Sequence, residues 1–283
     1  MSFPIIINNT NWINNNTYKV QLSSTLDLND FGVSVGQAFI YYSWYNINQN
    51  PLNNNSFVLT IPTSGASTVN TIVIPDGAYN ISDLNNYLQY WLIANGYYIT
   101  NNTTGLNTYY ASFSISPTSY AVQFNTTPMP TSLPSGYTSG GMTFPGGSNQ
   151  HYQLTVASTN NFKDIIGFNA GIYPTVPTNT GTQTKNSDYT PNVNPISAVQ
   201  MRLSCVYNPF SSNSQLVHVF MNKGSNIGEI IDASPIELQY VPCIGAHREL
   251  TLTFYDQNGY ILNILDKNLT IKLVFKKIKN VVN

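Results

Sequence analysis

Residues 269–276 read Leu-Thr-Ile-Lys-Leu-Val-Phe-Lys, with an apolar residue at every second position from Leu269 to Phe275. Successive side chains of a β-strand point to opposite faces, so this alternation predicts a strand with one buried and one wetted face. Upstream, residues 256–259 read Asp-Gln-Asn-Gly between two such runs, and Asn-Gly supplies the positive φ angles that a tight hairpin needs. We therefore expect the C-terminal region to form an antiparallel sheet.

Short runs of β-branched and aromatic residues, separated by clusters of Asn, Gly, Pro and Ser, continue along the whole chain and predict an all-β protein. The expected strands are residues 17–28, 37–47, 57–61, 69–74, 109–115, 120–124, 152–156, 197–207, 216–221, 236–241, 250–255, 260–264 and 269–275. About a dozen strands is typical of a sandwich or a barrel.

One longer helix is predicted at residues 82–92, where five apolar residues recur at helical spacing: Leu84, Tyr87, Leu88, Trp91 and Leu92. Asn80 or Ser82 is suited to cap its start and Gly96 to close its end. A shorter helical turn is expected at 161–166, ending at Gly167. We expect the longer helix to pack one face on a sheet.

Two stretches interrupt the strand pattern. Residues 126–150 and 174–195 are rich in Pro, Gly, Thr and Asn, and they predict long exposed loops. Loops of this length in a compact domain are usually functional or mobile.

The composition of the 283 residues is unusual: only 8% are charged, against about 25% in an average soluble chain. Asparagine, with 39 residues, is expected to cover much of the surface instead. The 42% of hydrophobic residues excludes intrinsic disorder, and the net charge of −1 argues against nucleic acid as the main partner. No apolar stretch is long enough to span a membrane as a helix, and the N-terminal residues do not resemble a signal peptide.

Charged residues are absent from two long tracts, residues 31–75 and 84–162. Charges normally protect exposed strands against edge-to-edge pairing, so their absence indicates surfaces covered by copies of the chain or by partners. Bias in an AT-rich genome is the alternative, because it inflates Asn, Tyr and Ile. The same bias would inflate Lys, of which the chain has only 9.

No motif for phosphate, dinucleotide or zinc binding, and no nucleophile elbow, occurs in the sequence. His151, His218 and His247 are scattered, and we expect no catalytic, cofactor-binding or metal-binding residue and no enzymatic activity. Cys205 and Cys243 are too far apart in sequence for a C-x-x-C site and are expected to be buried thiols.

Local turn formation explains several of the carboxylates, and the C-terminal lysines have two alternative explanations. Several carboxylates stand in turn-forming contexts, which explain them by local hydrogen bonds: Asp27, Asp30, Asp76 and Asp256. Four of the cations cluster near the C-terminus: Lys272, Lys276, Lys277 and Lys279. They are either a solvated strand edge or a contact to an acidic neighbour or to nucleic acid.

Several segments, taken in order and spacing, carry a family resemblance. Residues 72–84 read IVIPDGAYNISDL and lead into the predicted helix, and residues 162–168 read FKDIIGF. The last third contributes the segments 204–208, 227–229, 242–243 and 252–256. Together they resemble the penton, or minor capsid, proteins at the vertices of mavirus-like virophages and polinton-like viruses.

The resemblance implies a single jelly-roll domain over residues 1–283, with an insertion or elaborated loops at about 101–195. We accordingly expect a jelly-roll sandwich of two antiparallel sheets with one flanking helix. It further implies a homopentamer at the fivefold vertices of an icosahedral virion, surrounded by trimers of a double jelly-roll major capsid protein and assembled in the host cytoplasm.

Two other functions fit parts of the sequence. A carbohydrate- or receptor-binding module, such as a spike head or a lectin-like domain, would use the aromatic platform of Tyr41, Tyr42, Trp44 and Tyr45. A strand buried on both faces explains that apolar run better. A glycosidase on the same fold would need two facing carboxylates, and carboxylates are sparse in this chain.

Overall fold

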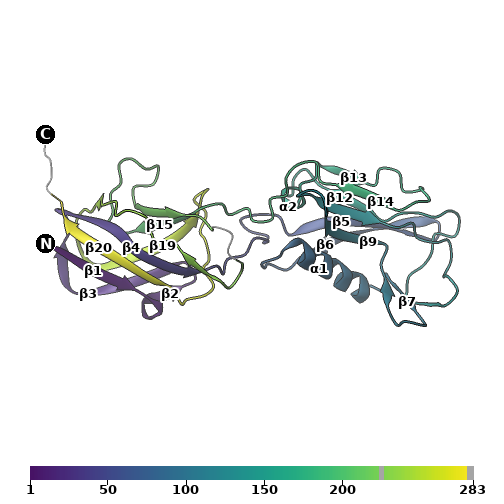
Figure 1. The fold of residues 1–283 in the computed structure, drawn as a ribbon, viewed down its shortest axis with the longest axis horizontal. Coiled ribbons are helices and arrows are strands. Elements are labelled where there is room, and N and C mark those ends of the chain that lie inside the picture. Colours follow the sequence, from purple (N-terminus) through teal and green to yellow (C-terminus); the bar gives the residue numbers. More distant parts are fainter. Residues whose placement is uncertain (223–225, 279–283) are drawn as a thin grey trace. The chain divides into compact units, whose positions relative to one another are not determined.

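The structure is a computed structural model that describes residues 1–222 and 226–278. Contacts divide the chain into two compact units, drawn in Figure 1: unit 1 comprises residues 1–44 and 196–283, and unit 2 comprises residues 45–195. The segment between the two halves of unit 1 thus begins at Tyr45, whereas we expected an insertion or elaborated loops at about 101–195. A single domain over 1–283 stays a prediction.

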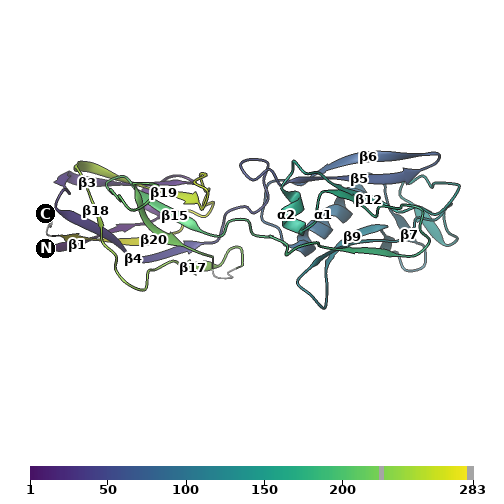
Figure 2. The same ribbon diagram turned by 90° about the horizontal axis from the view of Figure 1, so that it is seen from above.

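Unit 1 consists of β1 (Ser2–Ile7), η1 (Asn9–Asn11), β2 (Trp12–Asn14), β3 (Thr17–Asp27), β4 (Phe31–Tyr41), β15 (Val199–Leu203), β16 (Leu216–Phe220), β17 (Ile230–Asp232), β18 (Val241–Pro242), β19 (Ala246–Asp256) and β20 (Thr270–Lys277). One sheet has the order β1-β20-β4-β17, with β18 also on β4, and the other has the order β16-β15-β19-β3-β2. Every strand pair is antiparallel. The two sheets form separate layers (Figure 2).

The order of these strands is that of a jelly roll. If β2 and β3 are counted as one strand, and β17 and β18 as another, unit 1 has eight strands in chain order. One sheet then contains, side by side, the first, eighth, third and sixth of these strands. The other holds the fifth, fourth, seventh and second. Distant strands therefore lie side by side, as in two interlocked Greek keys. Unit 2 is inserted between the third strand, β4, and the fourth, β15.

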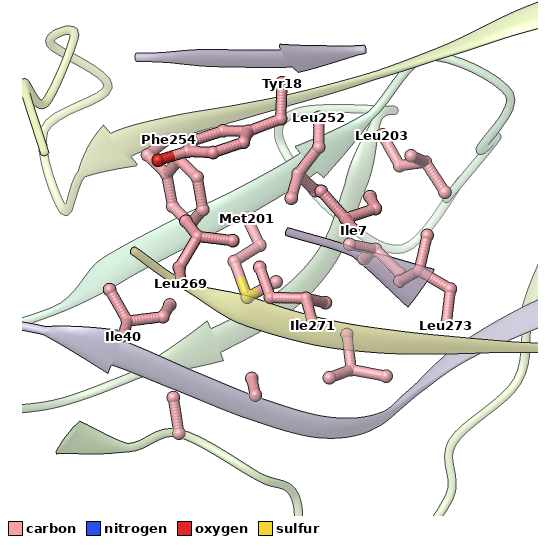
Figure 3. Close-up of a cluster of buried hydrophobic side chains, with 14 of the residues drawn as sticks. Ile7, Tyr18, Ile40, Met201, Leu203, Leu252, Phe254, Leu269, Ile271 and Leu273 are labelled. Atoms are coloured by element: carbon pink, nitrogen blue, oxygen red, sulfur yellow. The ribbon is translucent and has the colours of Figure 1, made fainter. Parts of the chain in front are cut away.

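The core of unit 1 lies between the two sheets, where side chains from both layers meet (Figure 3). On β20, Ile271, Leu273 and Phe275 are fully buried, whereas Lys272 and Val274 between them are only partly buried. The alternation read from residues 269–276 is confirmed.

Two features at the ends of unit 1 differ from the expectation. The N-terminal residues form β1, which pairs with β20 from Ser2–Lys276 to Ile7–Ile271. In the turn at residues 256–259, only Gly259 has a positive φ, of 83°, so Asn258 does not supply a second one. Asp256 shapes the turn instead, because its Oδ1 accepts from the N–H groups of Asn258 and Tyr260.

Unit 2 consists of β5 (Ser56–Thr63), β6 (Ala66–Val73), α1 (Ile81–Ala94), β7 (Ile99–Asn101), β8 (Asn107–Thr108), β9 (Ala111–Ile115), β10 (Val122–Thr126), β11 (Tyr137–Ser139), β12 (Gln153–Val156), α2 (Phe162–Ile166), β13 (Gly171–Tyr173) and β14 (Gln183–Asn186). Its sheets have the orders β13-β12-β5-β6, β14-β10-β9 and β11-β7-β8. They enclose a second hydrophobic core, separate from that of unit 1.

Helix α1 confirms the helical prediction, and Asn80 caps its start. The Asn80 side chain accepts from the N–H of Asp83, and the Asp83 carboxylate accepts from the N–H of Asn80, which is a complete capping box. The helix runs alongside β9 (Figure 1) and buries Leu84, Leu88 and Leu92 in the second core. Helix α2 ends at Gly167, in the left-handed conformation, as predicted.

Several segment boundaries were predicted wrongly. The expected loops at 126–150 and 174–195 each contain a strand, β11 on β7 and β14 on β10. The expected strand 37–47 ends at Tyr41. In place of the expected strand 236–241 the structure has only the short strand β18, and in place of the expected strand 260–264 it has a single bridge at Ile261. No described helix is long and apolar enough to cross a membrane.

Candidate assembly interface

Several of the sheet edges carry a feature that prevents pairing with another chain. Edge strand β1 contains Pro4, which has no N–H to donate, and edge strands β14 and β17 contain the charged residues Lys185 and Asp232. Strand β9 is covered by α1, because Oδ1 of Asn85 accepts the N–H of Phe113 at 2.9 Å. These edges are closed to further strands.

Strand β6 is an edge without such protection. It forms the end of its sheet and pairs with β5 in continuous register over all eight residues, without a bulge. Its sequence, Ala-Ser-Thr-Val-Asn-Thr-Ile-Val, contains neither a charged residue nor proline, and Val69 and Val73 are 68% and 54% exposed. At one end, the hydroxyl of Tyr87 donates to the carbonyl of Val73 at 2.6 Å. A neutral, bulge-free edge of this length favours association with other protein.

Strand β16 is the corresponding edge of unit 1. It ends the second sheet of the sandwich, and its sequence, Leu-Val-His-Val-Phe, has neither a Lys, Arg, Asp or Glu nor a proline. Its pairing with β15 has one irregularity, at Met201–Arg202. Val219 on β16 and Met221 directly after it are exposed, and Ile236, on the neighbouring segment, is 100% exposed.

A groove of about 630 Å³ lies between β16 and this neighbouring segment. Its described lining comprises Asn208 and residues of β4, β16 and 235–241, and Glu237 is the one Asp, Glu, Lys or Arg among them. His218 lies in the groove and its Nε2 is 2.8 Å from the carbonyl oxygen of Ala233. Burial lowers the pKa of His218, so the ring is neutral near pH 7. We call β16 and this groove the edge groove.

Unit 2 has an almost ion-free surface. It holds six of the chain's 23 charged residues, and four of these form two ion pairs, Lys163–Asp164 and Lys185–Asp188. The charge-free tract 84–162 lies entirely in this unit. The other tract, 31–75, includes β4, a strand inside the sandwich, so burial explains part of it.

The histidines lie apart and each contacts a backbone carbonyl. His151 is fully buried, with Nδ1 2.8 Å from Oγ1 of Thr126 and Nε2 3.0 Å from the carbonyl oxygen of Asn179. His247 similarly contacts Ile244. Within residues 1–222 and 226–278, His, Cys, Asp and Glu side chains do not gather into a group of three.

The predicted turn carboxylates have local partners in two cases: Asp27 accepts from the N–H of Asn29, and Asp256 shapes its turn as described above. Asp76 instead accepts from the distant N–H of Gln49, and Asp30 forms an ion pair with Lys277.

The C-terminal lysines do not all project freely. Lys277 pairs with Asp30 at 3.4 Å, and Nζ of Lys276 lies 5.5 Å from the centre of the Tyr240 ring. Lys272 is half-buried, and Lys279 lies outside the described residues. A contact of these lysines with an acidic partner, packaged DNA or an inner capsid component stays a prediction.

The aromatic run of residues 41–45 does not form an exposed platform. Tyr42 and Trp44 are 5% and 1% exposed, and their rings are 4.6 Å apart in the core of unit 1. Tyr41 is half-buried at the end of β4, and Tyr45 is exposed at the start of unit 2. Buried rings cannot stack on a sugar from solvent, so this residue set does not support a glycan site.

The edge strands were not identified as such from the sequence. Residues 69–74 and 216–221 were predicted as strands, and the lack of charge in residues 31–75 was noted, but position within a sheet depends on pairing between distant segments. The sequence feature that could have identified these edges is a strand pattern with exposed positions that contains neither a charged residue nor a proline.

Comparisons with known proteins gave similarities among solved structures. No family model and no curated protein matches the sequence. Among solved structures, the chain is similar to the crystal structure of selenomethionine-labelled mavirus penton protein, with a TM-score of 0.47 and 12% sequence identity, over 98% of this chain and 99% of that chain. This is the kind of protein that the sequence resembles.

Proposed function

We propose that this chain is a structural subunit of an icosahedral viral shell, located in the virion after assembly in the host cytoplasm, and that five copies form a closed ring at each vertex. The observation that carries the proposal is the pair of unprotected edges, β6 and β16, in a chain whose other long edges carry Pro4, Lys185 or helix α1. Jelly rolls are used in this way in viral capsids. In this role the chain performs no catalytic step.

A ring of five copies joins two different surfaces of each subunit, because the contact is heterologous and closes by rotation. The chain offers two non-equivalent surfaces with few charges, β6 in unit 2 and the edge groove in unit 1. Surfaces that remain outside the ring would meet the major capsid protein.

The contacts in such a ring would be mainly apolar and hydrogen-bonded, because few charges are present on these edges. Salt screens charge pairs but leaves neutral contacts almost unchanged. The purified chain should therefore sediment as a pentamer at low salt and at about 1 M salt. A monomer over a wide range of protein concentrations would refute ring formation by the protein alone.

A charged residue on β6 provides the sharper test. Val69→Lys places a cation in the middle of the unprotected edge and should shift the sedimentation profile from pentamer to monomer, with an unchanged circular dichroism spectrum. Thr184→Lys is the matched control, because it places the same cation on edge strand β14, beside the native Lys185. If both variants assemble equally well, β6 is not part of the interface.

A further inference from the structure

The chain has two cysteines, and the fold brings them together. Cys205 and Cys243 are 38 residues apart in sequence, yet their Sγ atoms are 3.8 Å apart. Both are free thiols, 0% and 2% exposed, in the core of unit 1.

The backbone around the two thiols is held in place on both sides. Cys205 follows β15 and Cys243 follows β18, and Val206 and Cys243 form an antiparallel bridge. The N–H of Ile244 donates to the carbonyl of Cys205 at 2.9 Å, and the N–H of Tyr207 donates to that of Pro242 at 2.9 Å. The two segments are thus neighbours before any bond joins the sulfurs. A disulfide needs its sulfurs about 2 Å apart, so a closure of roughly 2 Å by side-chain rotation is required.

We propose that Cys205 and Cys243 form a disulfide site whose co-reactant is a small-molecule disulfide, such as oxidised glutathione. In the first step the thiolate of one cysteine attacks the small disulfide, which forms a mixed disulfide and releases one small thiolate. In the second step the other cysteine, as thiolate, attacks the protein sulfur of the mixed disulfide and releases the second small thiolate. Two protein thiols lose two electrons and two protons, and one small disulfide becomes two thiols.

The first attack falls to Cys243. It lies beside β18, an edge strand of only two residues, whose local opening exposes it without unfolding the sandwich. Cys205 donates its S–H to Cys243, and this bond, together with burial, raises the pKa of Cys205, which keeps it protonated until the mixed disulfide forms. The disulfide between Cys205 and Cys243 then forms as β18 packs back onto the sheet.

A bond between these residues would tie the segment that contains β16 and β17 into a closed loop. Such a cross-link reduces the freedom of the unfolded chain. For a loop of about 40 residues the expected rise in Tm is about 5–10 °C. The site does not depend on the proposed function; in a virion, the thiols would be reduced inside the cell and would close in an oxidising medium.

The test refolds the full chain from urea in a glutathione buffer with equal reduced and oxidised glutathione, which removes any barrier due to burial. Remaining thiols are then blocked with N-ethylmaleimide in denaturant and counted by intact mass. We expect no maleimide adducts and a mass lower by two hydrogens, against two adducts for chain refolded with dithiothreitol. The single variants Cys205→Ser and Cys243→Ser should form no intramolecular bond.

The two forms of the same chain are then compared by thermal unfolding, and the oxidised form should melt at the higher temperature. Two free thiols after refolding, stable glutathione adducts on both cysteines, or disulfide-linked dimers would each overturn the proposal, as would an oxidised form that melts no higher than the reduced one. None of these readouts measures assembly, so failure here and failure of the ring are separate outcomes.

Discussion

The side chain of Asn85, on α1, closes the open edge of β9: its Oδ1 accepts the backbone N–H of Phe113 at 2.9 Å. Phe113 itself is buried, and its ring packs edge-on against that of Phe57, with centroids 5.7 Å apart. One polar residue of an amphipathic helix thereby satisfies an edge N–H that a neighbouring strand would otherwise take.

Removal of this acceptor should weaken unit 2. Asn85→Ala leaves the N–H of Phe113 without its partner and should lower the free energy of unfolding by about 1–2 kcal/mol, measured by urea denaturation. Asn86→Ala is the matched control, because Asn86 is the next residue of the helix and is exposed; it should cost less than about 0.5 kcal/mol. Equal losses in the two variants would show that the edge contact does not set the stability, because alanine is the better helix former at both positions.

Asn46 connects the start of unit 2 to its end. This buried side chain donates from Nδ2 to the carbonyls of Tyr79, at 2.7 Å, and Val193, at 2.6 Å, and its Oδ1 accepts the N–H of Tyr79 at 2.8 Å. Asn46→Ala should cost about 2–4 kcal/mol, because several backbone groups lose their partner. Asn46→Asp should cost more, because a carboxylate would face two carbonyl oxygens. Asn9→Ala, at an exposed position, should be nearly neutral; a loss as large as that of Asn46→Ala would contradict this assignment.

Asn46 also shows where composition misleads. An excess of asparagine predicts a neutral polar surface, but Asn16, Asn46, Asn54 and Asn55 are buried. The Nδ2 of Asn16, for example, donates to the backbone of Phe254 and Leu262. Sequence alone does not separate such residues from exposed ones, because their partners lie far away along the chain.

The parts of the fold that were predicted are those with local causes. Strand β20 follows from its alternation, and α1 from its apolar spacing and cap. Strand β1 was missed because residues 2–7 have only a short apolar run, and the pairing with β20, more than 260 residues away, decides its structure. The charge-free tract 31–75 contains β6, but the position of β6 and β16 at sheet edges was missed for the same reason, because an edge strand is defined by the neighbour that it lacks.

Unit 2 should fold without unit 1. It has its own hydrophobic core, and the Asn46–Val193 bond holds its two ends together. A fragment of residues 45–195 is expected to unfold cooperatively in urea and to show dispersed amide signals by NMR. The same fragment with Leu88→Ala, which removes a fully buried side chain, should lose about 2–5 kcal/mol. A fragment that is unfolded without denaturant would show that the chain behaves as the single domain expected from the sequence.

Stability should fall as the pH is lowered from 7 towards 5. Burial lowers the pKa of both His151 and His218 below the ordinary value of 6.5, so the folded state stays neutral where the unfolded state takes up protons. Each histidine then contributes stability that is fully present above pH 6.5 and is lost as the pH falls towards its folded-state pKa. The slope is at most about 1.4 kcal/mol per pH unit for each group.

The free energy of unfolding, measured in urea between pH 7 and pH 5, should therefore decrease for the native chain. The range ends at pH 5 so that most carboxylates stay ionised in both states. His151→Gln combined with His218→Gln should flatten this dependence, whatever the variant loses in absolute stability, because an amide does not titrate. The slope is the readout, and a double variant with the native slope would assign the pH dependence to other groups.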